Sequence, residues 1–342
     1  MNYYRLIAVF IILILILFSF NLDKGGRDIS IKTEPEVLGF YVNWSQNDLS
    51  SYNSLKKNSS SIDMVSPYWY TINSDGALIN VYQIEQEETV SFCRNENIEI
   101  LPLFNNKNTS YNILVDEQAR ERAINNIFNT VVNKNYAGAL IDFEYIPGRV
   151  DNELTNFIKE LSQRLNKRGK LLHIAVFPKV NFPDRLNLVY DYEELPDYVD
   201  RITIMTYDKH RKSTAPGPIA PINWVEDNIK YALQYMPSHK LHLGIANYGY
   251  DWTQPGEASS LGSRQIYDLA RREGKEVLWD EEFKSPYFQY RDRKNNLHEV
   301  WFENSKSLKY KLDLVKKYDL GGISIWKLGY ETEKFWNVMN TN

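Results

Sequence analysis

Cysteine is almost absent from this chain of 342 residues, which contains Cys93 alone. A single cysteine excludes an internal disulfide bond. Cys93 and five scattered histidines also fail to provide the clustered ligands of a zinc site. We therefore expect neither a metal nor a cofactor.

A strong charge of one sign is lacking as well. The formal net charge is -4, and the lysines and arginines are interleaved with acidic residues. Nucleic-acid-binding proteins instead concentrate basic residues in patches or stripes. We therefore expect no nucleic-acid partner.

One long apolar run, Leu6 to Phe20, stands near the start of the chain and is interrupted only by Ser19. Arg5 precedes it, which is typical of a signal peptide or a membrane anchor. No A-x-A cleavage pattern follows, so we interpret residues 1–22 as an uncleaved membrane anchor, with a cleaved signal as the alternative. Residues 23–35 are expected to form a polar tether, and the remaining chain to lie outside the cytoplasm.

Short β-branched or aromatic runs alternate with amphipathic stretches, a pattern typical of parallel βα units. Eight strands are predicted, at 37–44, 64–70, 98–105, 137–145, 171–177, 201–207, 241–248 and 322–327. Helices are predicted at 116–135, 152–167, 224–235 and 305–318. The fold class is therefore α/β, a (β/α)8 barrel over residues 36–342, with a small α+β insertion at 251–303 after the seventh strand.

Two carboxylates, Asp142 and Glu144, end the apolar run of the fourth predicted strand. Side chains alternate along a strand, so Leu140, Asp142 and Glu144 face the same side. Buried neighbouring carboxylates raise each other's pKa, which would keep a proton available for acid catalysis. A salt-bridged strand end is the alternative interpretation of these residues alone.

Several motifs resemble those of family-18 glycoside hydrolases, the chitinase family. The pattern of that family is D-G-x-D-x-D-x-E, and this chain reads A-G-A-L-I-D-F-E up to Glu144, so that Ala137 and Leu140 replace two aspartates. MTYD at 205–208, NYGYDW at 247–252 and GGISIWKLG at 321–329 follow in the order of the family. The branch that this chain resembles is the bacterial N-acetylglucosaminidases of spore cortex and cell wall, here without LysM modules.

The resemblance implies substrate-assisted hydrolysis of a polysaccharide containing N-acetylglucosamine, either peptidoglycan or chitin. Glu144 would be the acid and base, Asp142 would orient the 2-acetamido group, and Tyr207 would donate a hydrogen bond to it. Trp326 would form the floor beneath that sugar, with Asp208 and Met205 lining the same site. A protein that binds glycans without cleaving them remains an alternative.

Further residues stand at predicted strand ends, where the active sites of such barrels lie. Tyr41, Asn105 and Tyr248 are candidates for sugar contacts, and packing in the barrel wall is the equal alternative for each. Leu140 offers no hydrogen bond to Asp142 and cannot share a proton with it, as an aspartate would. We expect activity to persist, with a shifted pH profile.

Overall fold

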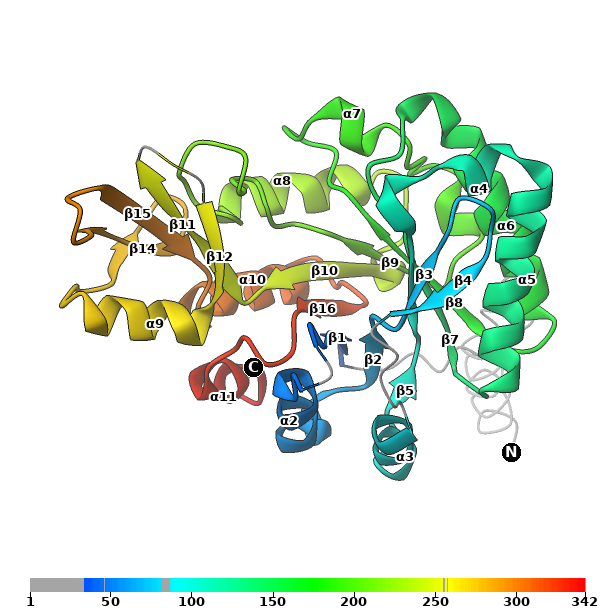
Figure 1. The fold of residues 1–342 in the computed structure, drawn as a ribbon, viewed down its shortest axis with the longest axis horizontal. Helices are drawn as coiled ribbons and strands as arrows, with labels where there is room; N and C mark the ends of the chain where they lie inside the picture. The colour runs from blue at the N-terminus through cyan, green and yellow to red at the C-terminus, as the bar shows by residue number, and fades with distance from the viewer. Residues whose placement is uncertain (1–33, 46, 82–86, 255, 257, 342) are drawn as a thin grey trace, which may run out of the picture. The chain divides into compact units, whose positions relative to one another are not determined.

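The computed structural model describes residues 34–45, 47–81, 87–254, 256 and 258–341. They form a barrel of parallel strands with surrounding helices and a smaller antiparallel sheet (Figure 1). The predicted anchor, residues 1–22, and nearly all of the predicted tether lie outside the described residues. Within the described ranges, no helix is long and apolar enough to cross a membrane.

Eight strand positions close the barrel, because β1 pairs in parallel with both β16 and β2. The positions are β1 (Glu36–Tyr41), β2 with β3 (Met64–Pro67, Tyr70–Ile72), β5 with β6 (Glu99–Ile100, Leu103–Asn106), β7 (Gly138–Asp142), β8 (Leu171–Val176), β9 (Arg201–Ile204), β10 (Leu241–Ala246) and β16 (Gly322–Trp326). The predicted barrel is thus confirmed. The third position is interrupted at Pro102, which has no N–H to donate but accepts a hydrogen bond from the amide of Leu140 at 3.0 Å.

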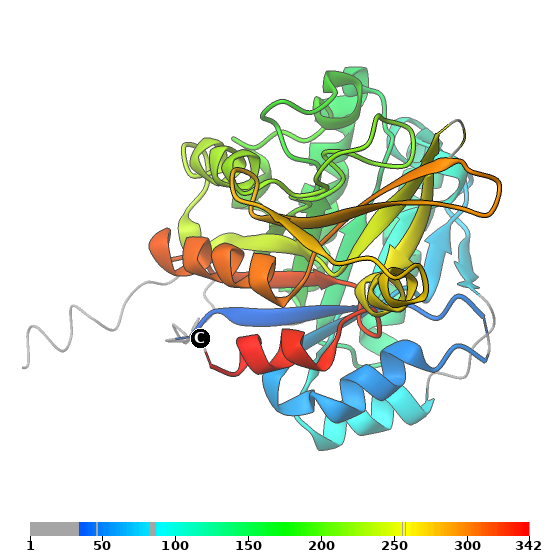
Figure 2. The same ribbon diagram turned by 90° about the vertical axis from the view of Figure 1, so that its left-hand side faces the viewer.

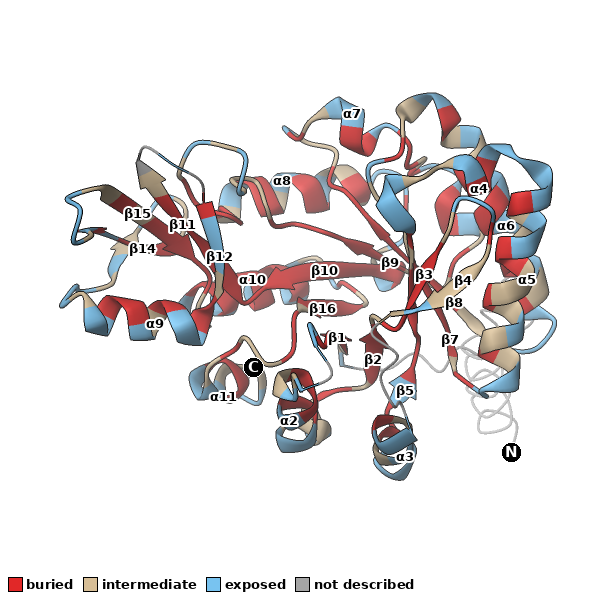
Figure 3. Cartoon of the chain, viewed as in Figure 1, coloured by how far each residue is buried: buried red, intermediate tan, exposed pale blue. Residues whose placement is uncertain are grey.

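Helices cover the outside of the barrel, and the longer ones turn a buried side toward the strands (Figure 3). They are α2 (Ser50–Lys57), α3 (Glu87–Asn95), α4 (Asn112–Val115), α5 (Glu117–Asn133), α6 (Asp151–Asn166), α7 (Asp184–Asn187), α8 (Ile222–Ala232), α10 (Ser305–Lys317) and α11 (Glu333–Met339). The predicted helix at 116–135 is α5, which starts one residue later because Asp116 is its N-cap. The Asp116 carboxylate accepts a hydrogen bond from the amide of Ala119 at 2.8 Å.

A buried polar network fills the barrel interior at the N-terminal ends of the strands. The Arg201 guanidinium donates two hydrogen bonds to Glu36, at 2.7 and 2.9 Å, and His242 Nε2 lies 3.2 Å from the same carboxylate. Burial opposes ionisation of Glu36, but these two partners outweigh it and hold its pKa well below the ordinary value. His173, on β8, stays neutral because its complete burial lowers its pKa.

The insertion between β10 and α10 is a five-stranded antiparallel sheet packed on one helix (Figure 2). It comprises β11 (Tyr248–Gln254), β12 (Ala258–Gly262), α9 (Ser263–Arg272), β13 (Leu278–Asp280), β14 (Ser285–Arg291) and β15 (Leu297–Phe302). Its first strand starts at Tyr248, before the predicted boundary at Asp251. The start of the sheet was missed because β11 directly follows the seventh barrel strand in the sequence and reads as its continuation.

A buried ion pair stabilises the segment in which the chain passes from the insertion back to the barrel. Lys311 Nζ on α10 lies 2.6 Å from the Glu303 carboxylate, and the two side chains are only 1% and 2% exposed. The amide of Glu303 also donates to the carbonyl of Tyr248 at 3.0 Å, so the first and last strands of the insertion are joined where they meet the barrel.

We expect Lys311→Met to lower the free energy of unfolding by about 3–5 kcal/mol, because it leaves the Glu303 carboxylate buried without its cation. The double variant Glu303→Gln/Lys311→Met should recover part of that loss. Lys57→Met, which breaks an exposed pair with Glu333, is the matched control and should change stability far less. Denaturant titration measures all three, and equal losses for the buried and exposed pairs would contradict the assignment.

Candidate active site

The two carboxylates predicted to carry the chemistry lie together at the mouth of the barrel. Asp142 is the last residue of β7 and pairs in register with Asn105 of β6. Asp142 and Glu144 both line a cleft of about 370 Å³. The cleft is lined by Trp44, Tyr68, Leu103, Asn105, Asn106, Asn108, Thr109, Asp142, Glu144, Tyr145 and Trp326.

The backbone after β7 is held in place by two side chains that the sequence analysis missed. Asn106 accepts a hydrogen bond from the amide of Glu144 at 2.9 Å and donates one to its carbonyl at 3.0 Å. The Tyr190 hydroxyl donates to the carbonyl of Phe143 at 2.8 Å. Asn106 had a sequence signal, since it follows Asn105 at the end of an apolar strand, but nothing in the local sequence pointed to Tyr190.

Burial dominates the electrostatics of the pair. It raises the pKa of Asp142 to about 7. It also raises the pKa of Glu144 well above the ordinary value, with smaller contributions from the negative charges of Asp142 and Asp208. Among the described residues, no hydrogen-bond partner contacts Oδ1 of Asp142. The pair therefore retains at least one proton near neutral pH, which is the state required of a general acid.

Tyr207 and Asp208 follow β9 and approach the carboxylates from another strand end. Burial raises the pKa of the Tyr207 hydroxyl, and the nearby charges of Asp142 and Glu144 raise it further, so that it remains a hydrogen-bond donor. Gly244 on β10 leaves room for the Tyr207 ring, because a Cβ there would lie 3.0 Å from Tyr207 Cε1 and 2.5 Å from the carbonyl oxygen of Ile204.

Asp208 is held by two tyrosines from the first strand of the insertion. The hydroxyls of Tyr248 and Tyr250 both donate to its carboxylate, the latter at 3.1 Å. Tyr248 was among the predicted residues and Tyr250 was not, although both belong to the NYGYDW motif. The side chain of Tyr248 is thus directed to Asp208, and Tyr207, Asp208 and Tyr248 are not among the residues that line the cleft.

The other predicted residues divide into two groups. Trp326 lines the cleft with its ring centroid 5.2 Å from that of Phe40, and Asn105 donates to the Tyr68 hydroxyl at 3.2 Å. Met205 is buried beyond the end of β9, behind the cleft lining. Tyr41 is buried on the helix-facing side of β1, where its hydroxyl lies 3.1 Å from the Thr89 hydroxyl of α3, so the structure places it outside this cleft.

Leu140 lies one layer below Asp142 and is completely buried. Its register partners are Leu103 on β6 and His173 on β8. The position is therefore packed with apolar side chains on the β6 side and faces a neutral imidazole on the β8 side. Among the described residues, no group of three or more His, Cys, Asp or Glu side chains is arranged to hold a metal ion.

Comparisons with known proteins show what the whole chain is similar to. The chain is 26% identical over 352 residues to the uncharacterized glycosylase YvbX of Bacillus subtilis, covering 99% of this chain and 98% of that protein. It is 31% identical over 235 residues to the cortical fragment-lytic enzyme of Bacillus subtilis, covering 67% of this chain and 54% of that enzyme. This chain thus spans about half the length of the lytic enzyme.

A solved structure, the chitinase of Chromobacterium violaceum, superposes with a TM-score of 0.84 at 29% identity, covering 90% of this chain and 98% of that one. The sequence profile of glycosyl hydrolases family 18 matches residues 36–331. A barrel with two partly buried carboxyl groups at the end of its fourth strand, within a profile match of this extent, identifies the chain as a member of glycosyl hydrolases family 18.

Proposed function

We propose that this glycosidase cleaves β-1,4 bonds after N-acetylglucosamine in peptidoglycan of the spore cortex or cell wall, by a retaining, substrate-assisted mechanism. The observation that carries the proposal is that two carboxyl groups, Asp142 and Glu144, line one cleft at the end of β7, where burial raises the pKa of both. The similarity to the cortical fragment-lytic enzyme supports the choice of glycan.

Glu144 acts as the acid in the first step and gives its proton to the glycosidic oxygen. Its raised pKa supports this role, because burial and the charge of Asp142 favour the protonated form. The acetamido oxygen of the substrate attacks the anomeric carbon as the glycosidic bond breaks, so that the protonated leaving sugar departs as an alcohol and the donor sugar becomes a cyclic oxazolinium ion. Glu144, now ionised, then takes a proton from the water that opens this ring, which returns the site to its starting state.

Asp142 and Tyr207 act on the acetamido group. Asp142 lies beside Glu144 with one oxygen unpaired in the described structure, so it is free to accept a hydrogen bond from the acetamido N–H and to stabilise the positive charge of the ring. Tyr207 donates to the acetamido oxygen. Trp326 forms the apolar floor, Asp208 and Met205 complete the site behind it, and Asn105 contacts sugar hydroxyls from β6.

A chitin or chito-oligosaccharide hydrolase is the second candidate. The chitinase of Chromobacterium violaceum supports it, since the match covers 98% of that chain. A glycan-binding protein without turnover is the third candidate, and the presence of Glu144 weighs against it. Reducing-end analysis of products from cortex peptidoglycan and from chitotetraose separates the two hydrolases.

The proposed place of action is outside the cytoplasm, on the cell or spore membrane. The apolar run within residues 1–22 supports a tether, with secretion as the outcome if that segment is cleaved. The similarity to cortex-lytic enzymes supports the same compartment, because the cortex is itself extracytoplasmic.

Glu144→Gln is expected to reduce turnover on the order of 10²-fold or more, because the amide is nearly isosteric but cannot give up the acid proton. Glycan binding and the melting temperature should change little. Release of reducing ends, followed alongside a thermal melt, tests this. Residual activity above about a tenth of wild type would reject Glu144 as the acid.

Asp142→Asn is expected to cripple turnover of acetylated substrates, because the neutral amide cannot stabilise the oxazolinium charge. A thiazoline that mimics this ring should bind the wild type and bind weakly to both Asp142→Asn and Tyr207→Phe. Calorimetric titration measures the affinities. Substrates that lack the 2-acetamido group must be cleaved more slowly than acetylated ones, and equal rates would refute substrate assistance.

Leu140→Asp is expected to destabilise the protein by several kcal/mol above the ordinary pKa of aspartate, because the position is completely buried, Leu103 offers no hydrogen bond, and the neutral His173 imidazole cannot balance a negative charge. The folded pKa of the new carboxyl should be raised, so that the part of the loss caused by ionisation grows as pH rises from about 4, while the smaller cost of burying the neutral carboxyl remains at lower pH. Thermal melts across pH measure this. A pH–rate profile reports whether the new carboxyl shifts the apparent pKa values of the pair. An unchanged melt and an unchanged profile together would show that position 140 does not act on Asp142.

A further inference from the structure

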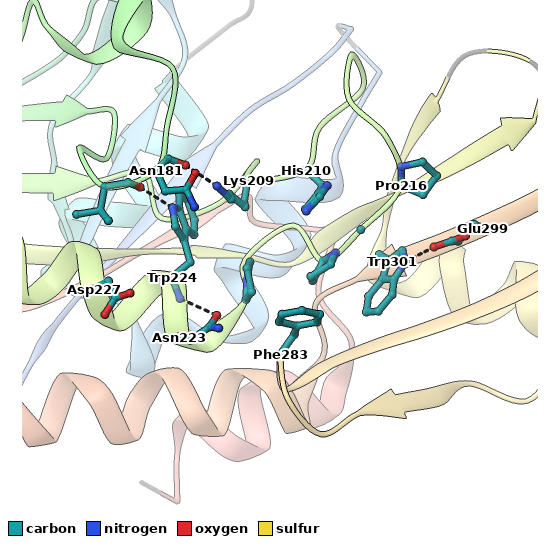
Figure 4. A pocket seen from close by; sticks show the side chains of 14 residues that line it. Asn181, Lys209, His210, Pro216, Asn223, Trp224, Asp227, Phe283, Glu299 and Trp301 are labelled. Carbon is teal, nitrogen blue, oxygen red and sulfur yellow. Dashed lines mark hydrogen bonds between the residues drawn. The ribbon is translucent and has the colours of Figure 1, made fainter.

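A second cavity, larger than the catalytic cleft, lies between the barrel and the insertion. Its volume is about 500 Å³ (Figure 4). Lys209 and His210 from the loop after β9, Asn223 and Asp227 from α8, and Phe283 and Glu299 from the insertion all line it. Among the described residues, the cavity and the catalytic cleft have no lining residue in common.

The walls of this cavity are fixed by contacts within the protein. Trp301 stacks on Tyr287 with ring centroids 4.6 Å apart, and its Nε1 donates to Glu299 at 2.7 Å. The indole of Trp224 donates to the carbonyl of Val180 at 2.7 Å. The amide of Ile222 donates to the carbonyl of Phe283 at 3.0 Å, which joins α8 to the insertion. A ligand would therefore meet a preformed surface and pay little for ordering it.

The chemistry of the lining suits an uncharged, hydroxyl-rich ligand. Phe283 and three prolines of the lining supply apolar groups, while Asn223 and Asp227 lie to one side of Phe283 and Glu299 to the other (Figure 4). The single lysine, Lys209, already donates to the carbonyl of Asn181 and lies over the Trp224 ring. The lining thus contains two carboxylates, Asp227 and Glu299, and one lysine that is already hydrogen-bonded. This charge balance disfavours an anionic ligand, such as a peptide stem with free carboxylates.

The cavity is also connected to the catalytic cleft through the protein. Lys209 directly follows Asp208, which lies next to Tyr207 and the carboxylate pair. A row of aromatic contacts runs from Tyr145 at the cleft through Phe177 and Phe182 to Trp224 at the cavity, with successive ring centroids 5.8, 5.4 and 6.4 Å apart. Packed aromatic rings thus connect the two sites, although they have no lining residue in common.

We propose that this cavity is a second, non-catalytic binding site for neutral saccharide units of the same glycan, held apart from the bond that is cleaved. The proposal rests on the proposed function for the identity of the sugar. Its physical basis is the combination of an apolar floor, hydroxyl-binding side groups and a lining with excess negative charge. A glycan strand bound there as well as in the cleft would dissociate more slowly than one bound at either site alone.

Calorimetric titration of the full-length Glu144→Gln chain with N-acetylchitotetraose tests the proposal. Two sites per chain are expected. Adding Asp227→Trp should fill the cavity from the exposed side of α8 and weaken one site at least about tenfold. Lys230→Trp is the matched control, because it adds the same bulk to the same helix outside the cavity and breaks the same Lys230–Asp227 contact of 3.8 Å. It should keep both sites.

Each result has a distinct meaning. One site that Asp227→Trp leaves unchanged overturns the second site while the proposed function stands. One site that Asp227→Trp abolishes supports the cavity and counts against binding in the catalytic cleft, and hence against the proposed function. No binding, or equal loss in both tryptophan variants, overturns the inference. Binding of a free stem tripeptide in place of the saccharide overturns the assigned ligand class.

Discussion

The burial of two carboxylates at alternate positions of one strand end is the constraint on which the site depends. Water no longer solvates them fully, and the charge of one opposes ionisation of the other, so the pair keeps a proton where an exposed pair would lose it. The hydrogen bonds from Asn106 and Tyr190 prevent the backbone from turning away and exposing the acids. A backbone fixed in this way keeps the two carboxyl groups close together and away from water, and so keeps their pKa values raised.

The same barrel contains a carboxylate in the opposite state. Glu36, at the other end of the interior, is ionised because Arg201 and His242 bind it. Leu140 is in register with His173, whose ring lies 5.1 Å from that of His242, so the polar network reaches the neighbour of Leu140 on β8. The aliphatic side chain of Leu140 cannot itself relay a proton from this network to Asp142 along β7.

The sequence predicted the barrel well because its strands are short, apolar and regularly spaced, and because parallel strands place their C-terminal ends at one mouth. The positions of Asp142, Glu144 and Trp326 at strand ends could therefore be predicted from the sequence. The direction of a side chain beyond a strand end could not, and Tyr41 shows why: alternation along β1 decides whether it faces the cleft or the helices, and a shift of one residue reverses the answer. Asn106 and Tyr250 were missed because their partners lie far away in sequence and only the fold brings them together.

The junction of the insertion has a consequence for how such barrels can diverge. The first and last strands of the insertion are hydrogen-bonded to each other where they join the barrel, at Tyr248 and Glu303. The part of the insertion beyond this bond can therefore lengthen, shorten or be exchanged without moving the ends of the barrel strands. Tyr248 and Tyr250 lie on the first of these strands and bind Asp208. A recombination that replaced the whole insertion would therefore also remove the two hydroxyls whose hydrogen bonds favour the ionised form of Asp208 against the effect of its burial.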